Sequence, residues 1–194
     1  MVLLEEQRTQ IVEVNTKNQF NRMFKEKNYQ SPTEEGKMEL FGTSTTSLYD
    51  TVVQAFMEAE LKFRTSNDQT ILQLGFTLEN GTYQVFVKTR EDRRQVLFFG
   101  YTDSKVPADK RLTVAELLTR ANFGILVGNF ELDMDTGEIR YKTCIDVDGG
   151  HLTPKMVHTH VTLNVGTLNQ YLPSILSVIY GGVEPKAAIQ KIEG

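Results

Sequence analysis

Residues 71–88 carry the pattern that most constrains how this chain can fold. Apolar side chains alternate with small or polar ones along 72–78 and again along 83–87, and Asn80-Gly81 lies between the two runs. A period of two predicts strands with one buried face, and Asn-Gly is the strongest short signal for a two-residue hairpin turn with positive φ. Folding at Asn80-Gly81 places apolar residues on one face of both strands. The predicted facing pairs are Leu78 with Tyr83, Phe76 with Val85, and Leu74 with Val87.

A second hairpin is predicted in residues 129–146, with its turn at Thr136-Gly137. Folding there places opposite charges across the strands on one face and apolar residues on the other. The predicted pairs are Glu131 with Lys142, Asp133 with Arg140, Leu132 with Tyr141, and Phe130 with Thr143. Opposite charges directly across two strands contribute roughly 0.2–1 kcal/mol each. Charge pairing and apolar alternation therefore select the same register.

Residues 93–101 follow the first hairpin and are apolar at both odd and even positions. Such a strand is typical of the centre of a sheet covered on both sides, or of an association surface. The segment thus predicts a third strand, without deciding between these two roles.

Helices are predicted by apolar residues at helical spacing over 46–59 and 110–126. Thr153-Pro154 marks the start of a third helix, which we expect to be interrupted near Pro173 because proline lacks the backbone N–H. A short last helix begins at Pro185. The order helix, three strands, helix, two strands, helix predicts an α+β fold, with helices packed on an antiparallel sheet.

Composition limits the class of protein. The chain has 194 residues, of which 40% are hydrophobic, and this suffices for one domain with a sizeable core. A net charge of −4 counts against nucleic acid as the main partner, because phosphate binding needs clustered basic residues. Cys144 is the single cysteine, so no internal disulfide can form. The start of the chain lacks the pattern of a secretory signal, and no stretch approaches the ~18 apolar residues of a membrane span. We expect a cytoplasmic protein.

The N-terminal part of the chain differs from the rest. Residues 1–30 are polar and charged with scattered apolar positions, and 31–47 contain Pro32, two glycines and a Ser/Thr cluster typical of a linker. We expect an N-terminal extension and linker over 1–42 and a folded domain over 43–194. The extension could be a docked helix, an arm exchanged between subunits, or a flexible tail.

Two groups of acidic and histidine residues suggest metal binding at first sight. The string Asp-Met-Asp-Thr-Gly-Glu at 133–138 has the rhythm of a calcium loop, but Cys144 stands where such a loop needs its twelfth-position Glu. A hairpin turn explains the same residues. The second group comprises Asp146, Asp148, His151, His158 and His160. Residues two apart on a helix point in different directions, so His158 and His160 do not converge on one ion. We expect no metal ion and no cofactor.

Cys144, the single cysteine, is the candidate thiol nucleophile. Alternation places it on a face with Arg140, Lys142 and Asp146, and the two basic residues would favour its thiolate. A lone cysteine in a strand is more often structural. The basic cluster of Arg90, Arg93 and Arg94 is interleaved with acidic residues and is typical of a solvated turn. No phosphate-binding loop, nucleophile elbow or zinc-protease motif occurs, and we predict no catalytic residue.

Three strings resemble the YbjN family of bacterial regulators, and especially its cyanobacterial branch. They are LTRANFGILVGNFELDMDTGEIRYKT, which begins at Leu118, then IDVDGGHLTP, and later YLPSILSVIYGG. The resemblance covers about residues 43–194. It implies a fold similar to that of type III secretion chaperones, with a helix, three strands, a helix, two strands and a helix. It carries over no catalytic residue, and by analogy of fold it implies a dimer that holds a segment of a partner.

Two elements hold more apolar surface than one small domain readily buries: the strand at 93–101 and an almost all-round apolar helix over 168–179. They indicate either a homodimer or partner surface, or a deep core beneath both. The candidate surface residues are Val96, Phe98, Leu168, Ile175 and Ile179. The leading hypothesis is a non-enzymatic, chaperone-like or regulatory protein-binding module that forms a homodimer. The alternatives are a small-molecule or metal-binding regulator and, third, an uncharacterised enzyme.

Overall fold

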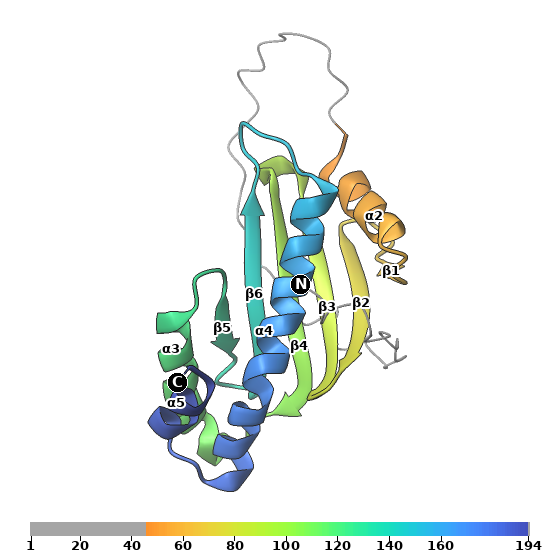
Figure 1. The fold of residues 1–194 in the computed structure, drawn as a ribbon. Helices are drawn as coiled ribbons and strands as arrows, with labels where there is room; N and C mark the ends of the chain where they lie inside the picture. The colour runs from red at the N-terminus through yellow and green to blue at the C-terminus, as the bar shows by residue number, and fades with distance from the viewer. Residues whose placement is uncertain (1–45, 194) are drawn as a thin grey trace, which may run out of the picture. The chain divides into compact units, whose positions relative to one another are not determined.

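The computed structural model describes residues 46–193 as an α+β arrangement around one antiparallel sheet, as the sequence predicts (Figure 1). The strands are β1 (Arg64–Thr65), β2 (Ile71–Leu78), β3 (Gly81–Arg90), β4 (Gln95–Lys105), β5 (Asn129–Leu132) and β6 (Glu138–Asp146). The helices are α2 (Leu48–Glu58), α3 (Arg111–Gly124), α4 (Pro154–Gly181) and α5 (Pro185–Glu193), with short 3-10 turns at Glu91–Arg93 and Ala108–Lys110. The predicted extension over 1–42 lies outside the described residues.

Two of the helices, α2 and α4, begin where a side chain accepts a hydrogen bond from one of their first free N–H groups. Ser47 Oγ accepts from Asp50 N at 2.9 Å at the start of α2, and Thr153 Oγ1 accepts from Met156 N at 3.3 Å at the start of α4. The start of α4 at Thr153-Pro154 is as predicted, and α2 begins at Leu48, two residues after the predicted start at 46. The two-residue strand β1 has no counterpart in the prediction, because two residues are too few to show a period.

The strand order is β1-β2-β3-β4-β6-β5, so β4 is central. Val96 and Phe98 on one face of β4 are fully buried, and Phe99 and Tyr101 on the other are nearly so. Helices α2 and α4 pack on the face that holds Phe98, which we call the helical face (Figure 1). The doubly apolar segment is therefore a central strand.

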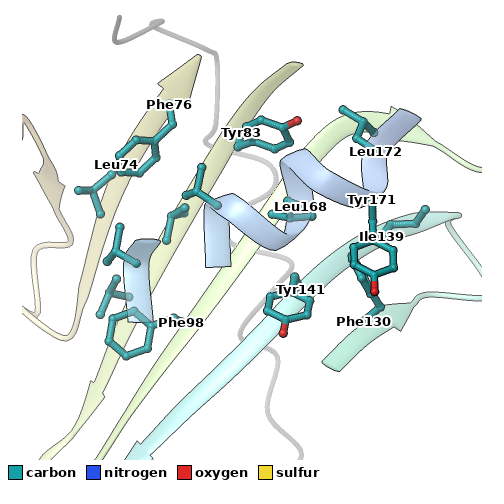
Figure 2. Packing of buried hydrophobic residues seen from close by; sticks show 14 of the residues in the cluster. Leu74, Phe76, Tyr83, Phe98, Phe130, Ile139, Tyr141, Leu168, Tyr171 and Leu172 are labelled. Carbon is teal, nitrogen blue, oxygen red and sulfur yellow. The ribbon is translucent and has the colours of Figure 1, made fainter. Parts of the chain in front are cut away.

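The core lies between α4 and the helical face, where Leu168 of α4 points toward the sheet (Figure 2). Gly100 of β4 allows this close approach, because a Cβ there would lie 2.0 Å from Asn164 Oδ1 and 2.5 Å from Leu168 Cδ1. At the end of the core toward β5, Phe130 packs edge-on against Tyr141 and Tyr171, with ring centroids 4.9 and 5.3 Å apart. The helix is thus held against the sheet at both the glycine and the aromatic group.

The first hairpin has the predicted apolar face, but its register is two residues away from the prediction. Phe76 pairs with Tyr83 rather than Val85, and Leu78 pairs with Gly81. The predicted pairs Leu78 with Tyr83, Phe76 with Val85 and Leu74 with Val87 are therefore wrong. The turn residues are Glu79 and Asn80, and none of residues 79–81 has a positive φ. The Asn80 N–H donates to Asn169 Oδ1 of α4 at 3.0 Å, so a contact from the helix holds the turn one residue earlier than the Asn-Gly signal predicts.

The second hairpin shows the same kind of difference. Glu131 pairs with Arg140 rather than Lys142, Phe130 with Tyr141 and Leu132 with Ile139, so the four predicted pairs are wrong while both faces are right. The loop is longer than predicted: Asp133 N donates to Glu138 O at 2.9 Å and Gly137 N donates to Asp133 O at 2.8 Å. Gly137 takes a φ of 76°, the left-handed conformation that closes such a loop. The Glu131 carboxylate still bonds Lys142 diagonally as well as Arg140, whose Nε lies 2.5 Å from it.

Helix α4 runs through Pro173 without a break, which corrects the predicted interruption. Proline at this position removes the hydrogen bond to the carbonyl of Asn169, four residues earlier. Asn80 Nδ2 donates to that carbonyl oxygen at 2.9 Å and takes the place of the missing N–H. The hairpin turn therefore supports the helix at the residue where proline weakens it.

Candidate protein-binding surface

The residues considered for metal binding have ordinary structural positions. Asp133 Oδ1 accepts from Asp135 N at 2.8 Å and from Thr136 N at 3.1 Å, so this carboxylate stabilises the hairpin turn. His158 is exposed, whereas His160 is half-buried and stacks on Phe98, and burial lowers the pKa of the His160 imidazole. Within residues 46–193, no three His, Cys, Asp or Glu side chains lie close enough to hold a metal ion.

Cys144 is exposed on β6, on the face of the sheet opposite α4. Partial desolvation by the surrounding atoms and the Asp146 carboxylate raise the pKa of its thiol, against the opposing effects of Lys142 and Arg90. This corrects the expectation that neighbouring charges favour the thiolate. Because His160 packs on Phe98 from the helical face, the sheet separates this imidazole from the thiol. His160 therefore cannot act as the base that a nucleophilic Cys144 would need.

The basic cluster forms the predicted solvated turn between β3 and β4. Arg94 has a φ of 52° and lies 3.8 Å from the Glu91 carboxylate, and Arg93 lies 3.4 Å from that of Asp92. Glu91 also accepts from Tyr49 N at 3.0 Å and so connects the turn to α2. Exposed pairs of this kind contribute little to stability, and they offset the positive charge that a phosphate would need.

The predicted partner surface is part of the core of the chain itself. Its members are Val96 and Phe98 with 0% exposure, Leu168 with 0%, Ile175 with 1% and Ile179 with 4%. Because β4 is central and α4 contacts the sheet, α2, α3 and α5, the chain covers these residues on every side. The interpretation as an accessible surface is wrong for these five residues, and the alternative of a deep core describes them.

A different group of apolar side chains is exposed. Phe123 is 96% exposed, Leu126 is 97% exposed and Val127 is 44% exposed. Phe123 lies in the last turn of α3, and the other two lie in the connection to β5. We call Phe123, Leu126 and Val127 the α3 tip. Large apolar side chains with this degree of exposure, three within five residues of chain, are typical of a surface that binds another protein.

The backbone that carries the α3 tip is held from both ends. Ile125 N donates to Ala121 O at 3.2 Å, and the hydroxyl of Tyr141 bonds the carbonyl of Val127. Asn122 Nδ2 donates to Phe130 O at 3.1 Å and Asn122 Oδ1 accepts from Phe130 N at 2.7 Å. These bonds tie the last turn of α3 to β5. A surface that is already ordered loses less entropy on binding, which favours affinity.

Gly128 follows the tip and has a φ of 87°. A Cβ at this position would lie 2.6 Å from the Lys142 carbonyl oxygen, so only glycine allows the chain to turn into β5 this close to β6. The glycine thereby sets the direction in which the connection leaves α3.

Charge around the tip is mixed. Arg120 lies 2.8 Å from the Glu116 carboxylate on the exposed side of α3, and Leu112 at the start of the same helix is 79% exposed. Glu193 lies near Gly124, where a Cβ would be 3.1 Å from its carboxylate. An apolar centre with paired charges at its margin matches the anatomy of protein interfaces.

A signal for the tip exists in the sequence. The buried residues of α3 are Val114, Leu117, Leu118 and Ala121. Phe123 follows Ala121 by two residues, which places it away from this apolar stripe and on the polar side of the helix. An aromatic residue on the polar side, followed by an apolar run between two glycines, would have indicated an exposed site.

The fold and this surface define an α+β protein that presents a small, ordered apolar patch. Residues 48–177 match the YbjN family, which is described as "Putative bacterial sensory transduction regulator". The match spans more than half of the chain, and the protein belongs to this family. This agrees with the resemblance found in the sequence.

Two further comparisons concern solved structures and curated proteins. A solved structure described as "Crystal structure of YbjN, a putative transcription regulator from E. coli" is similar with a TM-score of 0.49 and 17% sequence identity, covering 62% of this chain and 84% of that chain. No curated protein matches the sequence. Among residues 46–193, no helix combines the length and apolar character needed to cross a membrane.

Proposed function

We propose that this chain is a non-enzymatic regulatory protein that binds other proteins and forms a homodimer through the α3 tip. The observation that carries the proposal is the almost complete exposure of Phe123 and Leu126 on an ordered backbone. Full burial of a Phe or Leu side chain contributes roughly 1.5–3 kcal/mol. In a two-fold dimer the same patch is buried on both protomers, so the four side chains act together.

The family description fits this role, and the sequence supports further parts of the proposal. The description of the YbjN family concerns regulation rather than a chemical reaction. We propose further that residues 43–194 are the YbjN-like domain and that 1–42 form an N-terminal extension. The strings from Leu118 onward favour the cyanobacterial branch, and cytoplasm is the compartment that the single cysteine favours.

Sedimentation velocity on the full chain over a range of concentrations tests the homodimer. We expect a dimer that dissociates on dilution, and the double variant Phe123→Ser, Leu126→Ser should dissociate at about tenfold higher concentration or more. The matched control is Met57→Ser, Tyr180→Ser, which removes two other large apolar side chains, 66% and 70% exposed. A monomer at all concentrations, or equal weakening in both double variants, would contradict the proposal.

A further inference from the structure

A group of buried apolar side chains lies on the face of the sheet opposite α4, which we call the outer face. Its members are Ile71 with 5% exposure, Phe86 with 0%, Phe99 with 7% and Tyr101 with 6%. Phe86 of β3 pairs directly with Phe99 of β4, and the rings of Phe86 and Tyr101 meet edge-on with their centroids 5.8 Å apart. These four residues of β2, β3 and β4 form one apolar surface, which we call the outer patch.

The helices within residues 46–193 do not account for this burial. Their buried apolar side chains join those of the helical face in one core cluster, and the four residues of the outer patch lie outside that cluster. Helix α4 packs on β3, β4 and β6 from the helical face, and it contacts α2, α3 and α5 (Figure 1). A sheet face without a second layer is open to water, so large side chains on it remain partly exposed. Side chains with at most 7% exposure therefore need a cover on the outer face.

The cover belongs to the same chain, because the patch is buried within a single copy. Residues 1–12 are the most apolar part of the segment that precedes α2: 6 of these 12 residues are apolar, compared with 8 of the 33 residues at 13–45. Leu3 and Leu4 precede Ile11 by eight and seven residues, a spacing that places the three side chains on one side of a helix. Glu5 and Glu6 fall on the other side. The sequence at 1–12 therefore predicts a short amphipathic helix.

The connection is long enough to bring this helix to the outer face. Tyr49 N donates to the Glu91 carboxylate at 3.0 Å, so α2 starts beside the turn that joins β3 to β4, and these strands carry most of the patch. The 33 residues at 13–45 span at most roughly 110 Å when fully extended. Strand β4 has 11 residues and is only about 36 Å long. The length of the connection therefore allows residues 1–12 to reach any point of the patch.

The size of the patch also fits such a helix. Ile71 is level with Leu97 of β4 in the register of the sheet, and Leu97 precedes Tyr101 by four residues. The patch therefore extends about 13 Å along the strands, and its three strands, about 4.8 Å apart, make it roughly 10 Å wide. A helix of 12 residues is about 18 Å long and about 10 Å in diameter. One helix of this length covers the patch.

A buried polar group beside the patch also needs a partner. Gln84 lies on the outer face across from Tyr101 and is 4% exposed. Its Oε1 accepts from Gln73 Nε2 at 3.1 Å, whereas its Nε2 is buried and has no hydrogen-bond partner among the described groups. Buried donors of this kind are nearly always paired in folded proteins. Gln7 falls between Leu4 and Ile11 on the apolar side of the predicted helix, so its side-chain oxygen is an acceptor that the segment would bring to this face.

We propose that residues 1–12 form an amphipathic helix that packs on the outer patch through Leu3, Leu4 and Ile11. The sheet then lies between two layers, with α4 on the helical face and this helix on the outer face. The inference does not depend on the α3 tip, because it concerns a different surface and holds whether or not the homodimer exists.

Photo-crosslinking from Cys144 tests this arrangement on the full chain. Cys144 is the single cysteine, and it is exposed on the outer face, where it pairs with Leu97. A benzophenone coupled to its thiol therefore lies beside the outer patch. We expect crosslinks from Cys144 to residues 1–12, located by mass spectrometry. A mixture of unlabelled and ¹⁵N-labelled chains separates crosslinks within one chain from crosslinks between two.

A matched pair of double variants tests the apolar side of the helix. In Leu4→Ser, Ile11→Ser, the docking side loses two large apolar side chains, and the yield of crosslinks to residues 1–12 should fall about tenfold or more. Val2→Ser, Val12→Ser changes two apolar residues on the other side and should leave the yield within about twofold. Crosslinks confined to residues 46–193, crosslinks that join two chains, or an equal loss in both double variants would overturn the proposal.

Tryptophan fluorescence gives an independent readout, because the chain contains no tryptophan. Phe99→Trp places one reporter in the outer patch, and Phe123→Trp places one at a position that is 96% exposed. In the otherwise unmodified chain, the emission of Phe99→Trp should lie at shorter wavelength and be shielded from acrylamide. Adding Leu4→Ser, Ile11→Ser should shift it toward the emission of Phe123→Trp. Tyr101→Trp replaces Phe99→Trp if the latter does not fold, and a patch reporter that acrylamide quenches as readily as Phe123→Trp would overturn the proposal.

Discussion

The two hairpins of the sheet close their turns in different ways. Between β2 and β3, the turn at Glu79 and Asn80 has no positive φ, and Asn80 directs both its main-chain N–H and its side-chain amide to Asn169 of α4. Between β5 and β6, Asp133 accepts two hydrogen bonds from the backbone of its own loop, and Gly137 takes a left-handed conformation. One turn is stabilised by a helix 89 residues further along the chain, and the other by neighbouring residues.

This difference shows how one turn can serve the rest of the fold. Asn169 Oδ1 accepts from Asn80 N and from the Tyr83 hydroxyl, while its carbonyl, freed by Pro173, accepts from Asn80 Nδ2. The first turn and the middle of α4 therefore stabilise one another. The β5–β6 loop receives a bond from Arg111 Nη1 to Met134 O at 2.9 Å, but its own residues already define its shape. Substitutions in the two turns should have different consequences.

The largest difference is expected between Gly137, which lies in the second turn, and Gly81, which directly follows the first turn as the first residue of β3. In Gly137→Ala, the new Cβ would lie 2.1 Å from the carbonyl oxygen of Val106, whose N–H also bonds Gly137 O, and the φ of 76° disfavours any side chain. Backbone cannot move away cheaply, so we expect a loss of about 2–4 kcal/mol in the free energy of unfolding. In Gly81→Ala, the nearest atom is a terminal methyl of Leu172 at 2.7 Å, which can rotate, and we expect about 1 kcal/mol. Urea denaturation measures both losses, and an equal or larger loss in Gly81→Ala would contradict this comparison of the two turns.

The link between the first turn and α4 can be tested by a double-mutant cycle on Asn80 and Pro173. Asn80→Ala leaves the carbonyl of Asn169 without a donor and should cost about 1–2 kcal/mol. Pro173→Ala restores a helical N–H, so it should recover about 1 kcal/mol more in the Asn80→Ala background than in the unmodified chain. The control cycle combines Asp133→Ala with Pro173→Ala and should be additive. Additivity in both cycles would contradict the proposed link.

The smallest expected effect is on how the free energy of unfolding depends on pH in acid. Burial acts to raise the pKa of Glu131, but hydrogen bonds and charges from Lys142 and Arg140 outweigh it and hold the pKa below its ordinary value of 4.5. A carboxyl whose pKa is lowered by folding contributes stability above its unfolded pKa and loses it as pH falls through the folded pKa. The free energy of unfolding of the Glu131→Gln variant should therefore depend less on pH below about 4.5 than that of the unmodified chain.

The first hairpin provides the contrast, since its contacts use amides and the Tyr83 hydroxyl, whose pKa burial raises to about 12. Asn169→Ala should lower the free energy of unfolding by a similar amount at pH 4 and at pH 7. A steeper acid dependence in Asn169→Ala than in the unmodified chain would contradict this account of the two turns.

Much of the fold is visible in the residues themselves. The period of two in residues 71–88 and 129–146 predicts which side chains share a face of the sheet, and the observed strand pairing keeps these faces. The helix starts at Ser47 and Thr153 follow from local capping. The site is less visible, because Val96, Phe98, Leu168, Ile175 and Ile179 are apolar for the same reason that any core is. Their positions along the sequence do not show whether these apolar residues lie in the core or on the surface.

The sequence by itself determined the class of fold and the face of each strand, because a shift of two residues leaves every side chain on the same side of a sheet. Tertiary structure decided the register of the first hairpin, since Asn169 of α4 holds a turn that the Asn-Gly signal does not predict. The register of the second hairpin follows from local hydrogen bonds to Asp133, which the Thr-Gly signal does not show. Tertiary structure also decided that α4 continues through Pro173, where Asn80 replaces the missing donor. Finally, it decided which apolar residues are covered and left Phe123 and Leu126 exposed, because burial depends on neighbours distant in the chain.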